Sequence, residues 1–574
     1  MKTIPFFSAV LALSLNSVFV LGAKVQCSGT FNPISAADFV KSMSPGWNLG
    51  NTLDAVGGEG KWNNPPVVEK TFDDIKAAGF KGIRLPVTWT TKIGPAPSYT
   101  VDPAWLERVS TVIDQITSRN FSVIVDVHHD SWEWFDFSKD ASANNVATLS
   151  AKFSALWTQI GTKLACKSSL VAFEPINEPP GSTKEHGDVL NKMNGVFLKA
   201  IADAGGWNEK RVVTLVGLGE DSVKTSQWFK KPEGNWTNPW ALQYHYYSPW
   251  GFVFAAIGAT TWGSDADKTN LETDLKLIRG NFTDVPLIIG EWQVSPVATE
   301  PAARWKYFDF FVRTAAKYNT STILWDNGND FLDRAKSTWR DDVAKQIYIS
   351  ASKGIANSLP ESTTDAQATE QQSSAYIFHK AGMAPQAQTL SYQLNGNTIT
   401  AVTMEDGSAM QPGDYSIDGS MIKFSNAFVG RFVNTTLAAP GIKANLTVKF
   451  SAGADSRIQV VIWDTPKLAG EATSKAVNDL ELKIPITWKG LPKVATVKAL
   501  VSDGRYLKDD WTKWLGPMQQ ARASYNDIWS FDADNLILTK NAASAVRSAG
   551  KSTTFTFEFF PRVESNTLNY TLTV

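Results

Sequence analysis

The sequence predicts an α/β protein in which a (β/α)8 TIM barrel is followed by two all-β modules. The chain has 574 residues, several times the length of a typical domain of about 100 to 200 residues, so several domains are expected. Short apolar runs alternate with helical patterns between Pro45 and Gly328. After Lys353 the helical patterns nearly vanish, and alternating strand patterns replace them.

The predicted barrel contains eight short runs of apolar or β-branched residues, separated by helical patterns. Because strands that alternate with helices form a parallel sheet, eight repeats predict a closed barrel. An open doubly wound sheet is the alternative, but no glycine-rich phosphate loop follows the first strand. The eight runs are residues 46–53, 82–87, 122–127, 170–176, 212–218, 242–247, 287–289 and 322–325.

The domain boundaries follow changes in composition. An apolar stretch near the start predicts a cleaved signal peptide at 1–23. A membrane anchor is the alternative, but the stretch is barely long enough to span a bilayer and is polar in its middle. The barrel is expected at 24–357, and the polar residues 358–374 predict a linker. Alternating strands predict a small β-sandwich at 375–465 and a second β domain at 466–574.

Composition excludes some functions. Lys and Arg number 55 and Asp and Glu 56, so the chain lacks the basic surplus of a nucleic-acid-binding protein. Beyond the first residues no stretch is long and apolar enough to span a membrane, and we expect no membrane partner. The chain has 22 Trp and 31 Phe, whose flat faces suit a ligand with planar faces, such as a sugar ring.

Secretion would expose two kinds of residue to new chemistry. Cys27 and Cys166 are the chain's only cysteines, and both would survive cleavage into an oxidising compartment, where one disulfide is plausible. Short N-x-Ser/Thr motifs mark candidate glycosylation sites in a eukaryotic host. They are Asn120, Asn235, Asn281, Asn319, Asn434, Asn445 and Asn569.

Two glutamates end strands on different sides of the predicted barrel, where barrel enzymes carry their working residues. Glu178 ends the fourth strand and Glu291 ends the seventh. Two facing carboxyl groups can cut an acetal, because one protonates the leaving oxygen while the other attacks or stabilises the anomeric carbon. Other polar and aromatic residues at strand ends are candidates for substrate binding: Arg84, His128, His129, Trp132, Asn177, His245, Tyr247, Trp292 and Trp325.

Seven motifs in this region resemble glycoside hydrolase family 5, and the first and last are similar to its subfamily 4. The resemblance implies an endo-β-1,4-glucanase or xyloglucanase with a retaining mechanism, in which Glu178 is the acid/base and Glu291 the nucleophile. It also implies that Arg84, His128, Asn177, His245, Tyr247 and Trp325 form the supporting pocket, with Asn177 placed to bind the sugar 2-hydroxyl. The motifs are GWNLGNTLDA at Gly46, GIRLPVTW at Gly82, VHHD at Val127, EPINEP at Glu174, HYY at His245, GEW at Gly290 and WDNG at Trp325.

The tail resembles the immunoglobulin-like spacer and the family 46 carbohydrate-binding module that follow some subfamily 4 barrels. The resemblance depends on GDYSIDGSMIKFS at Gly413, KFSAGA at Lys449 and a tryptophan pattern from Trp488 to Trp529. It implies that the last module can fold back toward the cleft. On this basis Trp511, Trp514 and Trp529 are candidate sugar contacts.

We therefore expect a secreted, monomeric endo-β-1,4-glucanase that acts on β-glucan polysaccharide without a cofactor. A metal at His128 and His129 is not expected, because adjacent strand residues point to opposite faces and no third ligand has a matching spacing. Rival functions are a strict xyloglucanase, a β-mannanase, or a non-catalytic polysaccharide-binding protein. The facing glutamates argue against a pure binder, which has no need of two facing carboxyl groups.

Overall fold

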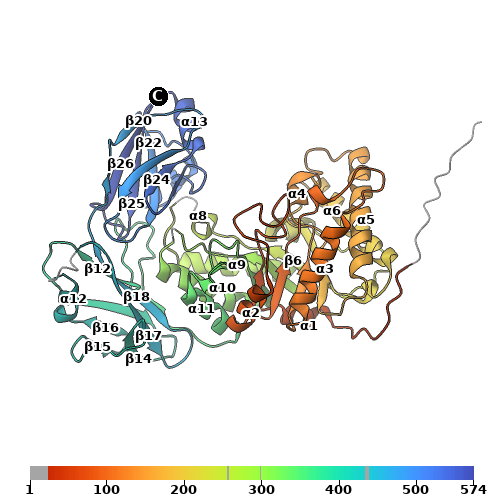
Figure 1. Ribbon diagram of the computed structural model, residues 1–574, viewed down its shortest axis with the longest axis horizontal. Helices are drawn as coiled ribbons and strands as arrows, with labels where there is room; N and C mark the ends of the chain where they lie inside the picture. The colour runs from red at the N-terminus through yellow and green to blue at the C-terminus, as the bar shows by residue number, and fades with distance from the viewer. Residues whose placement is uncertain (1–23, 255–257, 298, 434–438) are drawn as a thin grey trace, which may run out of the picture.

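The computed structural model describes residues 24–254, 258–297, 299–433 and 439–574. The predicted signal peptide at 1–23 and the motif at Asn434 lie outside these residues. Figure 1 shows three bodies in chain order, namely a barrel, a middle β module and a C-terminal β module. Within the described ranges, no helix combines the length and the apolar character needed to cross a bilayer.

Eight parallel strands close into a barrel, as predicted, because β1 pairs with both β2 and β8. Nearly every residue of these strands is buried, which suits a sheet that is covered on both faces. The strands are β1 (Gly46–Asn48), β2 (Gly82–Leu85), β3 (Ser122–Val125), β4 (Val171–Phe173), β5 (Val213–Asp221), β6 (Trp240–His245), β7 (Leu287–Trp292) and β8 (Thr320–Leu324).

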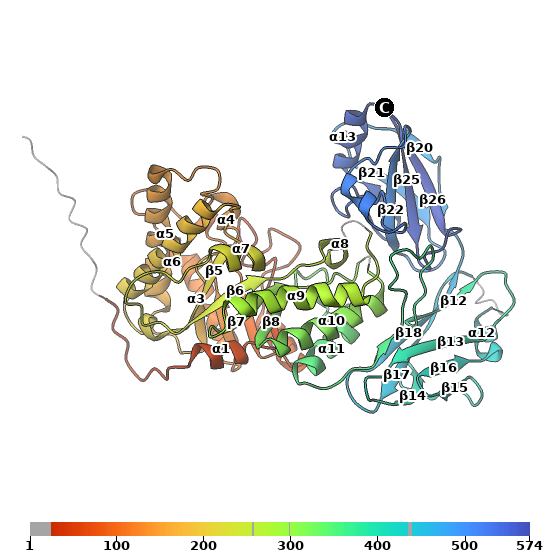
Figure 2. The same cartoon turned by 180° about the vertical axis from the view of Figure 1, so that it is seen from behind.

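A ring of helices covers the outside of the barrel, and Figure 2 shows α9, α10 and α11 side by side on one flank. Local signals set their ends: α3 begins with Pro103 after the N-cap Asp102, and α2 ends at Gly79, which adopts the left-handed conformation with φ of +97°. The helices are α2 (Glu69–Ala78), α3 (Pro103–Thr117), α4 (Asp130–Glu133), α5 (Ala143–Leu164), α6 (Lys184–Ala204), α7 (Ser222–Trp228), α8 (Trp250–Val253), α9 (Asp265–Asn281), α10 (Pro301–Lys317) and α11 (Asp342–Ser352).

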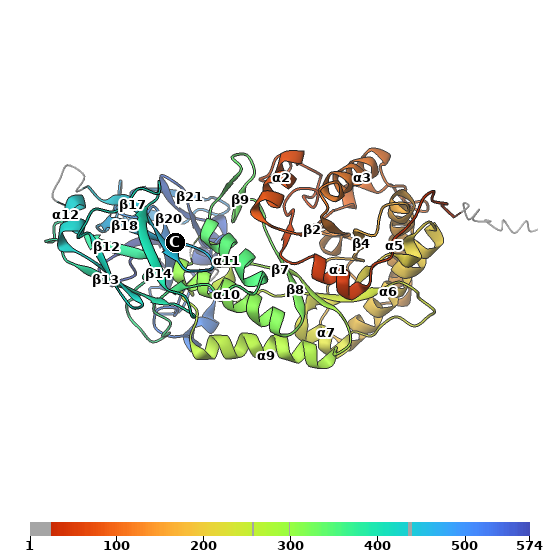
Figure 3. The same cartoon turned by 90° about the horizontal axis from the view of Figure 1, so that it is seen from below.

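Helix α1 (Ala36–Ser42) closes the N-terminal end of the barrel, as the view from below shows (Figure 3). Phe39 and Met43 pack there against Ile124 and Ile323, which point inward from β3 and β8. A disulfide between Cys27 and Cys166 ties the preceding segment to the end of α5. With this end closed, the cleft can open only at the carboxyl ends of the strands.

The middle module is a β-sandwich of two four-stranded sheets, ordered β11-β13-β16-β15 and β12-β18-β17-β14. The segment predicted as a linker contributes β11 to the first sheet, and the Ser373 hydroxyl in it donates to the carboxylate of Glu300 on the barrel. The elements are β11 (Leu359–Pro360), β12 (Tyr376–Lys380), β13 (Gln388–Gln393), β14 (Ile399–Met404), β15 (Tyr415–Asp418), β16 (Met421–Phe424), α12 (Asn426–Val433), β17 (Gly441–Phe450) and β18 (Ser456–Trp463).

The C-terminal module also has two four-stranded sheets, ordered β19-β21-β24-β23 and β20-β26-β25-β22. Figures 1 and 2 show it on the side of the barrel away from α1. Its elements are β19 (Lys467–Leu468), β20 (Thr473–Lys475), β21 (Leu482–Thr487), β22 (Val494–Val501), η4 (Asp510–Trp514), β23 (Trp529–Phe531), β24 (Asn535–Leu538), α13 (Lys540–Ala549), β25 (Thr553–Phe559) and β26 (Thr567–Thr573).

Polar contacts join the C-terminal module to the barrel beyond the ends of β6 and β7. The Lys493 ammonium donates to the carbonyl oxygens of Pro296 at 2.6 Å and Thr299 at 3.2 Å. The Arg562 guanidinium donates to the hydroxyl of Thr260 at 2.8 Å. The Arg562 contact is buried and the Lys493 contacts are half-buried, and together they hold the module against the loops that border the barrel's open end.

Candidate active site

Glu178 and Glu291 meet in the cleft at the open end of the barrel. One carboxylate oxygen of each and one ring nitrogen of His245 all lie within 4.8 Å of one another. The Glu178 side chain is 31% exposed and that of Glu291 only 6% exposed. Glu178 adopts a left-handed backbone conformation with φ of +40°, which is uncommon for a residue with a side chain.

Arg84 lies completely buried beneath the two glutamates. Its Nη1 donates to Glu291 Oε1 at 2.5 Å, and its Nε and Nη2 donate to the two oxygens of Glu174 at 2.8 and 2.6 Å. Nη2 also donates to Asn177 Oδ1 at 2.8 Å and lies 3.0 Å from Asp126. This cation stabilises the ionised form of Glu291.

The two glutamates differ in their remaining contacts. Tyr247 donates its hydroxyl to Glu291 Oε2 at 2.7 Å, which gives Glu291 a second donor. His245 Nδ1 lies 2.9 Å from Glu178 Oε1, and burial lowers the pKa of His245 to about 4, so this ring is neutral near neutral pH. Glu291 therefore faces a cation and a hydroxyl, whereas Glu178 faces a neutral ring and the cleft.

Burial raises the pKa of both glutamates above the usual range. For Glu178 the charges of Arg84 and His129 partly oppose the effect of burial. For Glu291 the charge of Arg84 and the hydrogen bond from Tyr247 oppose it. The two donors favour the ionised form of Glu291. Glu178 lacks them, so it keeps its proton more readily.

His128 and His129 follow the end of β3, and both enter the cleft region. His128 Nδ1 lies 2.7 Å from Asp126 Oδ2, and its ring stacks on Trp325 with centroids 5.8 Å apart. The His129 ring lies 3.8 Å from that of Trp132. The expectation that the two histidines point to opposite faces is wrong, because both lie past the strand and their rings are 4.4 Å apart.

Within the described residues, Asp54 lies close enough to His128 and His129 for the three to surround a cation. The Asp54 carboxylate already accepts the backbone N–H groups of Asn51 and Thr52 at 2.9 and 2.6 Å. His129 Nε2 lies 3.4 Å from the same carboxylate. The cluster is thus also suited to holding sugar hydroxyl groups.

Exposed aromatic rings lie beyond the ends of two different strands around Glu178 and Glu291. Trp132 is 57% exposed beyond the end of β3. Trp250, which is 58% exposed beyond β6, contacts Phe254 at a centroid distance of 4.1 Å, and Phe254 contacts Tyr247 at 4.8 Å. These rings can stack on sugar units on both sides of the bond to be cut.

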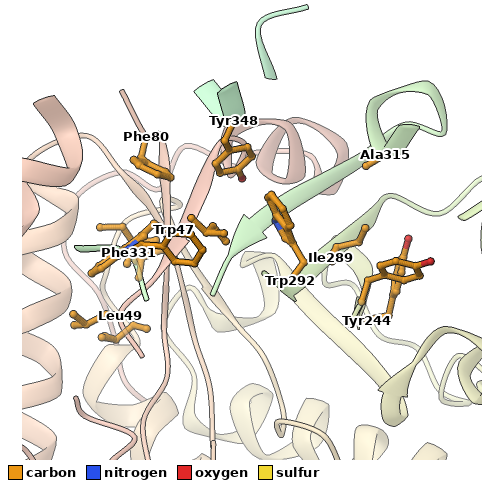
Figure 4. Close-up of a cluster of buried hydrophobic side chains, with 14 of the residues drawn as sticks. Trp47, Leu49, Phe80, Tyr244, Ile289, Trp292, Ala315, Phe331 and Tyr348 are labelled. Atoms are coloured by element: carbon orange, nitrogen blue, oxygen red, sulfur yellow. The ribbon is translucent and has the colours of Figure 1, made fainter. Parts of the chain in front are cut away.

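Two predicted sugar contacts are wrong, because the structure buries both side chains completely. Trp292 packs between the barrel and its outer helices, against Phe308 and Phe311 of α10, and Figure 4 shows it among core side chains. Successive strand residues alternate in direction, so Trp292 turns away from the cleft that its neighbour Glu291 faces. Trp529 lies in the core of the C-terminal module. In that module Trp511 is half-exposed and Trp514 is 82% exposed.

The sequence analysis missed the buried polar residues beneath the cleft. Glu174 and Asp126 neutralise Arg84, and Glu220 and Gln243 form a hydrogen-bonded pair nearby. Asp126 precedes His128 by two residues, and Glu174 begins the EPINEP motif. Both residues could therefore have been identified from their positions next to predicted site residues. Glu220 follows two glycines of an ordinary strand pattern, which gave no such signal.

Comparison with known proteins agrees with this geometry. Residues 48–331 match the family model Cellulase (glycosyl hydrolase family 5), and residues 371–460 match Carbohydrate binding domain X2. Endoglucanase B of Paenibacillus lautus is 30% identical over 94% of this chain and 99% of its own length.

Two solved structures share all three modules. A tri-modular family 5 (subfamily 4) endo-β-1,4-glucanase from Bacillus licheniformis, also crystallised with cellotetraose, is 35% identical with a TM-score of 0.81, over 94% of this chain and 99% of its own. Endo-β-1,4-glucanase B of Bacillus halodurans is 25% identical with a TM-score of 0.76, over 95% and 98%. The protein therefore belongs to glycosyl hydrolase family 5 and is a cellulase-type glycoside hydrolase.

Proposed function

We propose that the protein is a secreted endo-β-1,4-glucanase that retains the configuration of the anomeric carbon. The observation that carries the proposal is the short separation of Glu178 and Glu291, whose nearest oxygens lie within 4.8 Å. Retaining glycosidases hold their carboxyl groups about 5 to 5.5 Å apart, whereas inverting enzymes need roughly 6.5 to 9.5 Å for an intervening water.

The first step forms a covalent intermediate. Glu291, ionised beside Arg84 and Tyr247, attacks the anomeric carbon as the bond to the glycosidic oxygen breaks. Glu178 gives its proton to that oxygen, and the shortened glucan leaves with a free hydroxyl group.

The second step hydrolyses the intermediate. Glu178, now a carboxylate, takes a proton from water while the water oxygen attacks the anomeric carbon. The bond to Glu291 breaks, which restores both side chains and consumes one water. Asn177 accepts from Arg84 through Oδ1, so its amide nitrogen is the atom that can donate to the sugar 2-hydroxyl.

The exposed rings support a polymeric, internally cut substrate. Trp132 and Trp250 continue the site beyond the catalytic pair, so a chain can extend past the bond on both sides. The solved relative with cellotetraose makes β-1,4-glucans the first substrates to test. The Cys27–Cys166 disulfide supports secretion, because such bonds persist in oxidising compartments.

The test is release of reducing sugar from carboxymethylcellulose, mixed-linkage β-glucan, xyloglucan and mannan. We expect release from the glucans, and Glu291→Gln should lower it by about 10⁴-fold or more while glycan binding persists. Release from xyloglucan or mannan alone would change the proposed substrate and leave the proposed mechanism in place. No release from any polymer would favour a binding protein, and an α-configured first product would exclude retention.

A further inference from the structure

Glu220 is a buried carboxyl group that touches both the acid/base and the histidine beside it. It lies at the end of β5 with its side chain fully buried and a left-handed φ of +48°. A non-glycine residue in this conformation persists only where its surroundings fix it. The backbone N–H of Gly219 donates to the Pro179 carbonyl at 2.7 Å, which ties this turn to the loop that carries Glu178.

Three groups contact the Glu220 carboxyl. Its Oε2 accepts the backbone N–H of Glu178 at 2.8 Å, and its Oε1 accepts from Gln243 Nε2 at 3.0 Å. His245 Nε2 lies 3.2 Å from Oε2, while Nδ1 of the same ring lies 2.9 Å from Glu178 Oε1. Glu220 thus reaches Glu178 by two routes, directly through the backbone and indirectly through the His245 ring.

The neutral His245 ring carries a single proton, so it can donate from only one of its two nitrogens. If Nδ1 carries the proton, it donates to Glu178 Oε1 and leaves the other oxygen of Glu178 to carry the catalytic proton. Nε2, which is buried and has no hydrogen-bond partner of its own, is then a lone pair 3.2 Å from Glu220 Oε2, and a proton on Glu220 would remove the repulsion between the two lone pairs. The surroundings suit that state, because burial and the charge of Glu174 raise the pKa of Glu220 well above its usual range, against Arg84 and the Glu178 N–H.

We propose that Glu220 is a positioning residue for the acid/base: it fixes the backbone of Glu178 and keeps the His245 proton on the nitrogen that faces Glu178. The proposal rests on the proposed function, since it takes Glu178 as the proton donor. No atom of the substrate need touch Glu220. Its effect passes entirely through Glu178 and His245.

The test variant is Glu220→Gln, which keeps the shape of the side chain. Its carbonyl must accept the Glu178 N–H, so an oxygen without a proton then faces His245 Nε2. The ring proton should move to Nε2, and the Nδ1 lone pair should face Glu178. We expect the basic limb of the kcat/KM profile to rise by about half a unit to one unit, because Glu178 loses a donor to its ionised form.

Leaving-group dependence separates this role from a merely structural one. On cellotetraose, whose leaving group needs a proton, Glu220→Gln should lower kcat/KM by about 10- to 100-fold. On 2,4-dinitrophenyl β-cellobioside, whose leaving group needs no proton, kcat/KM should stay within about threefold of wild type. Equal losses on both substrates with an unmoved pH profile would overturn the proposal.

Asp221→Asn is the matched control. This residue follows Glu220 and caps α7 by accepting the N–H groups of Val223 and Lys224, which Asn can also accept. Its pH profile and leaving-group dependence should match wild type. A shift equal to that of Glu220→Gln would assign the effect to general charge loss at this strand end and overturn the proposal.

Two further measurements keep the outcomes distinct. If Glu178→Ala keeps wild-type kcat/KM on cellotetraose, the proposed function fails. If Glu178→Ala loses activity while Glu220→Gln behaves as wild type, only the positioning role of Glu220 fails. If Glu220→Gln does not fold, ¹⁵N-histidine spectra of the wild-type protein decide, with His245 assigned by the signal lost in His245→Asn. A protonated Nδ1 supports the role, and a protonated Nε2 overturns it.

Discussion

Arg84 shows at the residue scale how a buried cation organises several acids. It contacts Glu174, Asp126 and Glu291 with no exposure of its own side chain. Arg84→Met should therefore lower the free energy of unfolding by about 3 to 5 kcal/mol, because removing one partner leaves the carboxylates buried without a counter-charge. Urea denaturation measures this change. A loss below about 1 kcal/mol would mean that the carboxyl groups are held neutral without it.

The roles proposed for Glu178 and Glu291 predict the pH dependence of the rate. If Glu178 is the proton donor, activity falls as pH rises through the pKa of Glu178. If Glu291 is the nucleophile, activity falls as pH drops through the pKa of Glu291. Burial raises both pKa values, and the whole bell-shaped profile should lie above the ordinary range of glutamate.

Profiles of kcat/KM for wild type and Glu178→Ala check this prediction. On cellotetraose, whose leaving group needs a proton, wild type should show both limbs; on an aryl cellobioside whose leaving group needs no acid, Glu178→Ala should show the acidic limb alone. If wild type on cellotetraose shows no basic limb, deprotonation of Glu178 does not limit the rate.

At this scale, position at a strand end was enough to find Glu178, Glu291 and the residues around them. Alternation along β7 separates Glu291 from Trp292, and applying it strictly would have kept Trp292 out of the site. The partners of Glu220 could not be found in this way, because its contacts depend on a bulge in the pairing of β5 and β6 between Val216 and Asp221.

At the element scale, close packing of α1 against the strands closes one end of the barrel. A Cβ added at Gly82 would lie 2.5 Å from the Met43 Cα, so Gly82→Ala must move backbone. We expect it to lower the free energy of unfolding by about 1 to 3 kcal/mol.

Gly280→Ala is the matched control, because nothing lies within 4 Å of a Cβ there and the residue is in helix α9. It should raise the free energy of unfolding by roughly 0.5 to 1 kcal/mol. Urea denaturation of both variants measures the contrast. Equal changes in the two variants would mean that α1 shifts away from the added methyl group without loss of stability.

The eight strands were predictable because each carries a short buried run, and the observed strands fall within or close to those runs. The segment 358–374 was less predictable. Its polar composition predicts a linker, yet Leu359 and Pro360 pair with Gln393 and Tyr392 of β13, and its Gln371 N–H donates to the Arg562 carbonyl of the C-terminal module. A polar composition indicates that a segment forms no hydrophobic core of its own. These contacts are made by backbone groups, which every sequence has, so composition does not predict them.

At the scale of the whole molecule, Lys493 and Arg562 hold the C-terminal module beside the barrel's open end. Trp514 on η4 projects from this module with 82% exposure, and Trp511 on the same turn is half-exposed. An apolar ring this exposed contributes little to folding, and its free face is available to stack on a sugar ring of a bound chain.

Trp514→Ala should therefore weaken action on polymer and spare action on short oligosaccharides. Loss of one stacked ring is worth about 0.5 to 1.5 kcal/mol, so KM for carboxymethylcellulose should rise roughly 2- to 10-fold while kcat/KM for cellotetraose stays unchanged. Met383→Ala, which removes a 58% exposed side chain from the middle module, should alter neither value. An equal loss on polymer and tetrasaccharide would place Trp514 at the cleft itself. No loss on either substrate would show that Trp514 does not bind the polymer.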